Sequence, residues 1–429
     1  MTNETAAGRA CRVAVSGVGA VSGFGWGVVP LWEGLRAGRS AIRPFQRFDS
    51  ALHRTHLAAE VAAEPPAGLA RACREWRRLS QADRFALCAA LEAVAGAGLA
   101  APFADADPTV GVWFGSSTGG MFESEEFFRA FVTDRRRARV GALAAQQVNG
   151  PGDAIARHLG VTGPVATVSS ACASGALALG AALAAVRSGE VDVALAGGAD
   201  SLCQLTYAGF NALRSVDEGA CRPFRADRAG MSFGEGAAVL VLEPLARVLA
   251  RGAEPLAVLA GAGASCDAHH MTAPDPSGSG AAAAVAAALC DAGLPPSAID
   301  FVNAHGTGTP LNDTAEWAAL QQVFGERAER LPLTLTKALV GHLLGSAGAI
   351  EAVATVLCLR HGELHPAPGG ARPVPPAEGE AAELPPLPAS LVLDRPLPLP
   401  AARAAVSTSL AFGGSNAALV FARWAGQAA

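Results

Sequence analysis

The sequence lacks the marks of several protein classes. Its nine cysteines are an odd number and contain no CxxC pair or Cys/His ligand spacing, so neither a disulfide framework nor a zinc site is expected. No apolar run is expected to span a bilayer, because the Ala-rich stretch from Ala281 to Cys290 is too short. Residues Met1–Arg12 lack the cationic and apolar blocks of a secretory signal. We therefore predict a cytoplasmic protein that does not enter a membrane.

Charge is also scarce. Charged residues make up 17% of the chain and its net charge is −5, which argues against nucleic-acid binding. Hydrophobic residues make up 51%, enough for a core buried on several faces and too many for a disordered chain. At 429 residues, the chain is long for one domain of ordinary size, so two domains or one duplicated fold are expected.

Short apolar runs alternate with Ala-rich stretches of helical period. This alternation predicts an α/β fold with buried strands. Strands are expected at Val13–Ser16, Thr109–Phe114, Val165–Val168, Val191–Leu195, Ala237–Leu242, Phe301–Ala304 and Ala417–Phe421, and helices at Arg84–Ala95, Gly175–Arg187, Thr314–Val323 and Ala347–Arg360.

An internal repeat is visible between Ala171–Glu190 and Leu344–Glu363. Both segments end in Arg-x-Gly-Glu, which places a helix end and a glycine cap at the same point of each. Val13–Gly19 and Leu256–Gly263 are also alike. We predict a duplicated fold whose halves are residues 1–255 and 256–429. Pro366–Pro400 has no such periodicity and is expected to be an extended, Pro-rich surface insertion.

Cys172 is the strongest candidate nucleophile. The segment Val165–Gly175 is predicted to be a strand, a turn of small residues and a helix that begins near Cys172. A thiol at a helix N-terminus faces unsatisfied N–H groups that favour the thiolate. The alternative, a buried structural cysteine, is the expected fate of the other eight.

Two histidines follow in glycine-rich junctions. His305 lies at the end of a predicted strand in Asn303–Thr309, and His342 ends the segment Lys337–His342. The carboxyl ends of strands in α/β folds often line ligand crevices, so Cys172 and both histidines can meet between the halves.

At these residues the sequence resembles the 3-oxoacyl-acyl-carrier-protein synthases, the ketosynthases of fatty-acid and polyketide assembly. The resemblance covers nearly the whole chain. It rests on the segments Ser170–Gly175, Asn303–Thr309, Lys337–Gly348 and Phe412–Asn416, with support from Cys221–Gly230, Gly234–Gly236 and Ser265–Pro274.

The resemblance implies a thiolase fold with five layers, αβαβα, and usually a dimer. It implies that Cys172 carries an acyl chain, and that a malonyl thioester loses CO2 to give an enolate, held by His305 and His342, whose carbon attacks the acyl carbonyl. It further implies an oxyanion hole from the N–H groups of Cys172 and Phe412, a gating loop at Phe412 and Gly413, and an ion pair between Lys337 and Glu316, with a supporting role for Asp313. No cofactor or metal is implied.

The sequence departs from this family near the gate. Ala411 and Leu410 stand where relatives commonly have Gly and Phe, and Ala338 follows Lys337 where Ser is usual. Thr118, in the segment Gly115–Gly120 that resembles the acyl-tunnel loop, replaces a larger apolar residue. This change favours a type II polyketide ketosynthase, including one that makes polyenes, over an elongating fatty-acid enzyme, which remains the alternative.

The remaining predictions concern partners. Arg77 and Arg78, in a basic cluster with Arg71 and Arg74, resemble the surface where relatives dock the acidic acyl carrier protein, although a solvated face is the simpler interpretation. A non-catalytic chain-length subunit is disfavoured because Cys172, His305 and His342 are all present, and a thiolase because no second cysteine occupies a suitable junction. We expect a homodimer or a heterodimer with a subunit like a chain-length factor.

Overall fold

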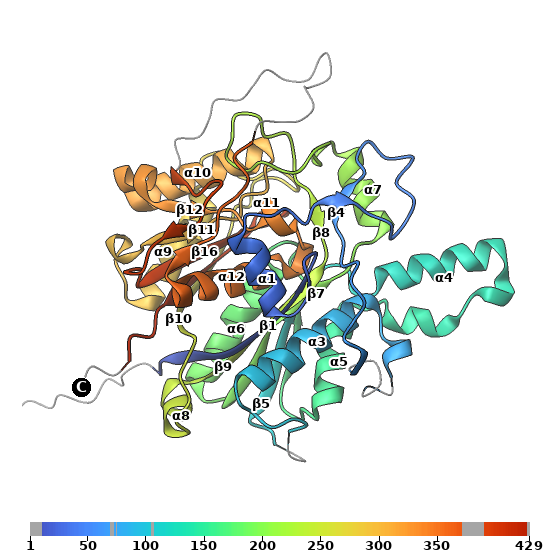
Figure 1. Cartoon of the computed structure of the whole chain (residues 1–429), viewed down its shortest axis with the longest axis horizontal. Helices are drawn as coiled ribbons and strands as arrows, with labels where there is room; N and C mark the ends of the chain where they lie inside the picture. The colour runs from blue at the N-terminus through green and yellow to red at the C-terminus, as the bar shows by residue number, and fades with distance from the viewer. Residues whose placement is uncertain (1–10, 69–72, 74, 104–106, 371–389, 427–429) are drawn as a thin grey trace, which may run out of the picture.

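The computed structural model describes residues 11–68, 73, 75–103, 107–370 and 390–426 (Figure 1). Its main sheet runs in the order β14-β12-β11-β16-β17-β10-β1-β9-β7-β5-β6, with β2 paired to β1. These strands are β1 (Val13–Ser22), β2 (Gly25–Trp26), β5 (Val110–Gly115), β6 (Val165–Val168), β7 (Val193–Asp200), β9 (Gly236–Pro244), β10 (Ala257–Cys266), β11 (Phe301–Asn303), β12 (Pro332–Thr334), β14 (Ser390–Leu391), β16 (Ala404–Leu410) and β17 (Ser415–Ala422). Two small sheets contain β3 (Arg43–Pro44), β4 (Leu57–Ala59) and β8 (Phe233–Gly234), and β13 (Glu363–Leu364) and β15 (Leu397–Pro398).

The α-helices are α1 (Val28–Arg36), α3 (Gln81–Gly96), α4 (Met121–Thr133), α5 (Gly150–Leu159), α6 (Ser174–Ser188), α7 (Gln204–Ala212), α8 (Leu245–Ala250), α9 (Ser279–Ala292), α10 (Pro310–Phe324), α11 (Lys337–Val340) and α12 (Ala347–His361). Short 3-10 turns are η1 (Trp76–Arg78), η2 (Arg135–Arg137), η3 (Val140–Ala145), η4 (Pro296–Ala298), η5 (Gly325–Arg330) and η6 (Leu344–Ser346).

The two halves of the chain meet where β1 pairs antiparallel with β10, with Val13 opposite Leu259. Strands of the first half continue from β1 to β6, and strands of the second half continue from β10 to β14. The similar segments Val13–Gly19 and Leu256–Gly263 therefore lie on neighbouring strands at the centre. In Figure 1 the blue-to-green half and the orange-to-red half lie on opposite sides of this join. The boundary near residue 255 stays a prediction.

Alternation along the strands produces the layers. On β9, Leu240 and Leu242 belong to the core that α6 and α12 share, whereas Val239 and Val241 pack with α3 and α5. On β17, Leu419 faces α6 and α12, while Val420 packs with α9 and α10. Because side chains alternate across a strand, one face of the strands in each half packs on α6 and α12 and the other face packs on the outer helices. The helices α6 and α12 therefore form the central layer. The order is αβαβα, as expected.

The repeat predicted from Arg-x-Gly-Glu is present in the structure. The helices α6 and α12 end at Gly189 and Gly362, both left-handed, with φ of 75° and 63°. They approach closely at their first turns, where a Cβ on Gly348 would lie only 2.8 Å from the backbone nitrogen of Ala176. Glycine is required there because a larger residue would push the two halves apart.

Two expectations need correction. The segment Ala171–Ser188 is long and apolar enough to cross a membrane by composition alone, but it is 61% buried and contains α6, a core helix of the fold. The ends of the Pro-rich segment are also ordered, since Ser390–Leu391 adds a parallel strand beside β12 and Leu397–Pro398 pairs with β13. Residues 371–389 of that segment lie outside the described residues.

Candidate active site

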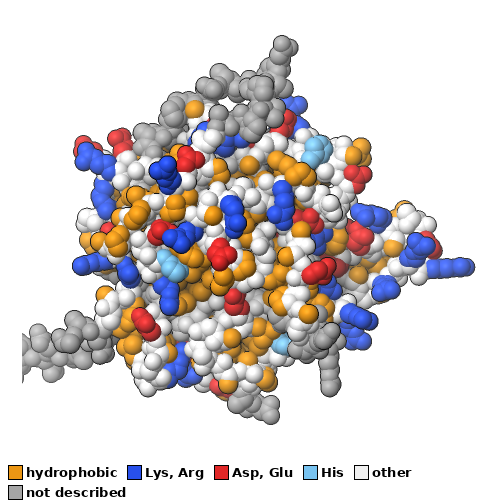
Figure 2. All heavy atoms as spheres, viewed as in Figure 1, with side chains coloured by type: hydrophobic (Ala, Val, Ile, Leu, Met, Phe, Trp, Pro, Cys, Tyr) orange, Lys and Arg blue, Asp and Glu red, His pale blue; other side chains and the backbone are white. Residues whose placement is uncertain are grey.

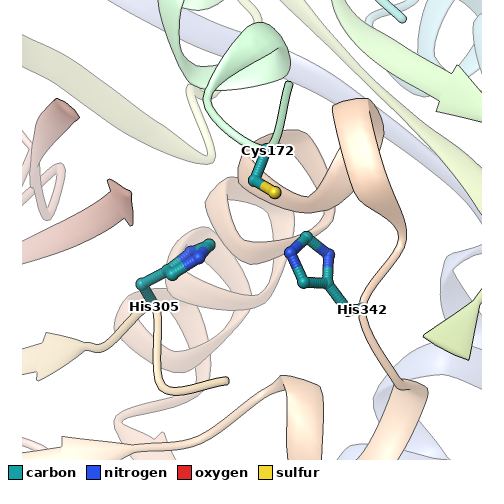
Figure 3. A group of neighbouring side chains, drawn as sticks. All are labelled: Cys172, His305 and His342. Atoms are coloured by element: carbon teal, nitrogen blue, oxygen red, sulfur yellow. The ribbon is translucent and has the colours of Figure 1, made fainter. Parts of the chain in front are cut away.

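Cys172 lies in the turn between β6 and α6, directly before the N-cap residue Ala173. The turn is tight: Ala171 has a φ of 44°, and the hydroxyl of Ser174 donates to the carbonyl oxygen of Ala171 (2.6 Å). Figure 3 shows the sulfur pointing into the space between the rings of His305 and His342. One donor atom from each of these three buried side chains lies within 4.8 Å of the others. The predicted convergence of the three residues is therefore present.

The expectation of a ready thiolate is wrong for the resting site. Burial raises the pKa of the Cys172 thiol to about 11, and this outweighs the nearby Lys337 and the backbone N–H groups of Phe412 and Cys172, which lower it. The helix begins two residues after the sulfur, so its terminal N–H groups do not compensate for lost solvation.

This raised pKa makes a kinetic prediction. Because only the thiolate is alkylated, inactivation by iodoacetamide should accelerate about tenfold for each pH unit between about pH 7 and about pH 9. The measurement is the pseudo-first-order rate of Cys172 alkylation, followed by mass spectrometry of its peptide. A rate that levels off near neutral pH would contradict the raised pKa.

His305 follows β11 and is anchored through its backbone. Its N–H donates to Oε1 of Glu316 (2.8 Å) and to Oγ1 of Thr408 (3.0 Å). Nδ1 of its ring lies 2.9 Å from Nζ of Lys337. Because an ammonium group only donates, Nδ1 accepts and the proton of the neutral ring is on Nε2.

His342 follows α11 and has the same tautomer for a different reason. The backbone N–H of Leu344 donates to its Nδ1 (3.0 Å), so Nε2 again carries the proton. Burial and Lys337 lower the pKa of both rings well below the ordinary value. The rings lie 5.5 Å apart at an angle of 88°. The site therefore presents two neutral Nε2–H donors beside one thiol.

These tautomers do not suit a metal. A histidine that binds zinc usually donates its other ring N–H to a carboxylate, carbonyl or water. Here Nδ1 of each ring accepts a hydrogen bond instead, so binding a cation at Nε2 would require loss of the ring proton. The residues fit hydrogen-bond donation to an oxygen better, and a metal-free site stays our prediction.

Lys337 pairs with Glu351 of α12, not with Glu316 as expected. Its ammonium contacts the Glu351 carboxylate, and burial raises the pKa of Glu351 to about 7. Glu316 instead accepts from the N–H groups of His305 and Gly306 and from the hydroxyl of Thr408. Lys337 is the only lysine in the chain and only 1% exposed, so it serves as a buried link between His305 and Glu351.

Removing one partner of this pair should be costly. Glu351→Ala leaves a buried ammonium without its carboxylate, so we expect the free energy of unfolding to fall by about 3–5 kcal/mol. Urea titration followed by circular dichroism measures the loss. The double variant Lys337→Met/Glu351→Leu should recover most of it, and a Glu351→Ala protein as stable as the original chain would show that the pair carries no such role.

Asp313 supports the loop behind His305. Its carboxylate accepts from the N–H groups of Phe224 (2.7 Å) and Gly308 (3.1 Å), and burial raises its pKa to about 6. It touches neither ring, so the structure assigns it a structural role.

Phe412 closes one side of a cavity of about 330 Å³ above the three residues. Its ring stacks on Phe210, with centroids 5.2 Å apart and an angle of 15°. Gly413, at a φ of 84°, donates its N–H to the carbonyl oxygen of Met271 (2.8 Å). The backbone N–H groups of Phe412 and Cys172 both lie close enough to the sulfur to lower the pKa of its thiol, and the oxyanion hole that they are expected to form stays a prediction. The predicted loop is therefore part of the site.

Other predicted residues lie apart from this cavity. Thr118 is buried and does not line it, and its hydroxyl donates to Asp200 (2.9 Å), so the polar group is not free to meet an acyl chain. Arg77 and Arg78 lie on η1 at the rim of a separate surface hollow that also contains Arg84, Arg139 and Arg157. Arg71 and Arg74 lie outside the described residues.

Sequence reasoning missed Glu351, Thr408, Phe210 and Asp200. A signal existed for Glu351, since it is the one charged residue in the first turns of the apolar segment Ala347–Arg360. The sole lysine similarly marks Lys337 as unusual in a chain with 33 basic residues. Nothing in the sequence distinguishes Phe210 or Thr408 from ordinary core residues.

Comparison with known proteins identifies the family of this chain. The family model for the N-terminal domain of beta-ketoacyl synthases matches residues 10–247, and that for the C-terminal domain matches residues 256–370. The 3-oxoacyl-acyl-carrier-protein synthase 2 of Synechocystis sp. is 35% identical over 423 residues, which cover 96% of this chain and 98% of the relative. The enzyme of the same name from Staphylococcus aureus is also 35% identical, over 432 residues.

Solved structures match over similar lengths. A chain of the ishigamide ketosynthase/chain length factor superposes with a TM-score of 0.88 at 34% identity and covers 96% of this chain and 99% of that one. The ketosynthase ApeO in complex with its chain length factor ApeC, from Xenorhabdus doucetiae, gives a TM-score of 0.80 at 30% identity, over 96% and 98% of the two chains. The fold is thus the thiolase-like fold of ketosynthases, and the chain belongs to the beta-ketoacyl synthase family of acyltransferases.

Proposed function

We propose that this condensing enzyme extends an acyl chain held on Cys172 with a two-carbon unit from malonyl-acyl-carrier protein, in type II polyketide biosynthesis. The observation that carries the proposal is the sulfur facing two neutral imidazoles that present Nε2–H groups. A site of this kind stabilises negative charge on oxygen without requiring a strong base.

The first step is acyl transfer. The sulfur of Cys172 attacks the thioester carbonyl, the bond to the carrier sulfur breaks, and the thiol proton leaves with the carrier. The negative charge on the carbonyl oxygen develops beside the N–H groups of Cys172 and Phe412. Those donors belong to the turn before α6 and to the Phe412 loop, so both are beside the sulfur before the charge develops.

The second step is decarboxylation. The malonyl thioester loses CO2, and the electron pair of the broken bond becomes an enolate. The enolate oxygen accepts hydrogen bonds from Nε2–H of His305 and His342, which stay neutral because their pKa values are low. The enolate carbon then attacks the acyl carbonyl, and the Cys172 thiolate leaves.

The polyketide assignment is supported by the structural matches to ketosynthases that pair with chain length factors. Elongation in fatty-acid synthesis is the second candidate, favoured by the identity to the synthase 2 enzymes. Single-turnover reactions with malonyl carrier protein and matched saturated, polyunsaturated and 3-oxo acyl carriers separate the two. We expect the unsaturated or oxo chains to react fastest, and a clear preference for saturated chains would favour fatty-acid elongation.

The partner proposal is based on one exposed apolar surface. Phe128 and Val132 of α4, Val140 of η3 and Leu205 of α7 are each more than half exposed. Strand β6 is at the edge of the main sheet. In Figure 1 the α4 segment stands away from the body, and Figure 2 shows basic side chains at its outer end. We propose that a subunit like a chain length factor binds this apolar surface. Size-exclusion chromatography with light scattering tests this, since a stable homodimer of this chain alone would favour a second copy.

The acyl carrier protein is the proposed substrate carrier, and Arg77 and Arg78 are the proposed docking residues. The hollow beside them is lined by five arginines and also by Glu75, Asp83, Glu123 and Asp153, so the proposal depends on the exposed positions of Arg77 and Arg78 themselves, where they can attract an acidic partner. A cytoplasmic location also stays a prediction, in keeping with nine cysteines that are all free.

A further inference from the structure

Asp200 is a buried carboxylate at the end of β7 that the reaction described above does not use. It is 0% exposed. Its Oδ1 accepts from the hydroxyl groups of Ser116 (2.7 Å) and Thr118 (2.9 Å) and from the N–H groups of Ser117 (3.0 Å) and Thr118 (2.8 Å). Its Oδ2 accepts from the N–H groups of Ser117 (3.0 Å) and Gly345 (2.6 Å). A buried carboxylate with so many donors fixes the segments that supply them.

One branch from Asp200 leads to the nucleophile. Ser117, whose N–H the carboxylate holds, donates its hydroxyl to the carbonyl oxygen of Ala171 (3.1 Å). Ala171 is the residue before Cys172, and its φ of 44° is unfavourable for a residue with a side chain. The loop after β5 therefore supports a strained peptide unit next to the sulfur.

The other branch leads to His342. Gly345, whose N–H donates to Oδ2, follows Leu344, and the Leu344 N–H donates to Nδ1 of His342. Leu344 also has a left-handed backbone, with a φ of 52°. In the repeat Ala171–Glu190 and Leu344–Glu363, Ala171 and Leu344 are the corresponding first residues. Asp200 thus joins the two equivalent strained turns of the duplicated fold.

We propose that Asp200 is a positioning residue that fixes the sulfur of Cys172 and Nε2 of His342 at the right position relative to each other. It touches neither reacting group and acts through Ser117 on one side and through Gly345 and Leu344 on the other. This inference rests on the roles proposed for Cys172 and His342. It also gives Thr118 a role, since its hydroxyl is one of the donors that hold the carboxylate in place.

Asp200→Asn separates the two branches. The amide oxygen is expected to take the position of Oδ1, which has four donors, so the amide NH2 would face the Gly345 N–H, and two donors would oppose each other. The turn that holds His342 should shift while the Ser117 branch remains. We expect decarboxylation of malonyl carrier protein to fall about 10- to 100-fold, and the alkylation rate of Cys172 to change less than about threefold.

Glu92→Gln is the matched control. Glu92 is a half-buried carboxylate that accepts hydrogen bonds from the N–H groups of Ala20 (2.9 Å) and Val28 (2.8 Å), outside the cavity. Its variant should lose stability and keep the ratio of decarboxylation to alkylation. Equal loss of both rates in Asp200→Asn, or no loss beyond that of the control, would overturn the proposal.

Ser117→Ala tests the other branch and serves if Asp200→Asn does not fold. It removes the hydrogen bond to the Ala171 carbonyl, so we expect the alkylation rate to change and decarboxylation to stay within about threefold. Equal effects on the two rates would contradict the proposal that Asp200 acts through two separate branches.

His342→Ala separates this inference from the proposed function. If that variant decarboxylates normally, the proposed role of His342 fails, whereas if it is impaired and Asp200→Asn is not, only the inference about Asp200 fails.

Discussion

Replacing Cys172 with alanine is expected to lower the condensation rate by at least about 10,000-fold, because loss of a nucleophile removes the covalent step itself. The neighbouring donors stay in place, so malonyl carrier protein should still lose CO2 in this variant. Condensation is measured as 3-oxoacyl carrier product by mass spectrometry, and decarboxylation as acetyl carrier product. The separation of the two activities is the specific outcome expected.

Cys358→Ala is the control for this substitution. Cys358 is likewise buried, and burial raises the pKa of its thiol to about 12, but it lies on α12 away from the cavity. Its variant should condense at nearly the original rate. Condensation that persists in Cys172→Ala would show that the chain is carried elsewhere.

The second large effect is expected at the histidines. His305→Ala or His342→Ala removes one donor to the enolate oxygen, which typically costs about 100- to 1000-fold in rate. Decarboxylation should show the full loss. Acylation of Cys172 should change less, because the N–H groups of Phe412 and Cys172 remain.

His365→Ala provides a comparison, since His365 is also buried with its pKa lowered to about 4 but does not line the cavity. Decarboxylation by folded His365→Ala protein should be close to that of the original chain.

A pH profile adds a further check. Because the pKa values of His305 and His342 are lowered, decarboxylation should not decline as the pH falls through about 6.5, the ordinary value for histidine.

The fold and the three central side chains could be predicted because both leave local signals. The period of the apolar residues gave the elements, and the Arg-x-Gly-Glu ends of α6 and α12 marked the duplication. Cys172, His305 and His342 stand in runs of small residues at element junctions, where a side chain can be exposed to a ligand.

The partner of Lys337 could not be predicted, because it depends on how α10 and α12 pack. Glu316 and Glu351 lie on these two helices, and both are buried beside His305 or Lys337. The α12 helix is buried almost throughout, so it has no polar face that would reveal which side chain points inward. The expectation of a lowered pKa for the Cys172 thiol was wrong for a related reason. The start of a helix is visible in the sequence, whereas the depth at which the sulfur is buried is not.

The most direct test of the central claim is the mass of the protein after one turnover. Incubation with an acyl carrier protein and no malonyl donor should add one acyl group, located on the Cys172 peptide, and malonyl carrier protein should then remove it as the extended product. Cys172→Ala should gain no mass. An acyl group found on another residue, or one that malonyl carrier protein does not remove, would contradict the account.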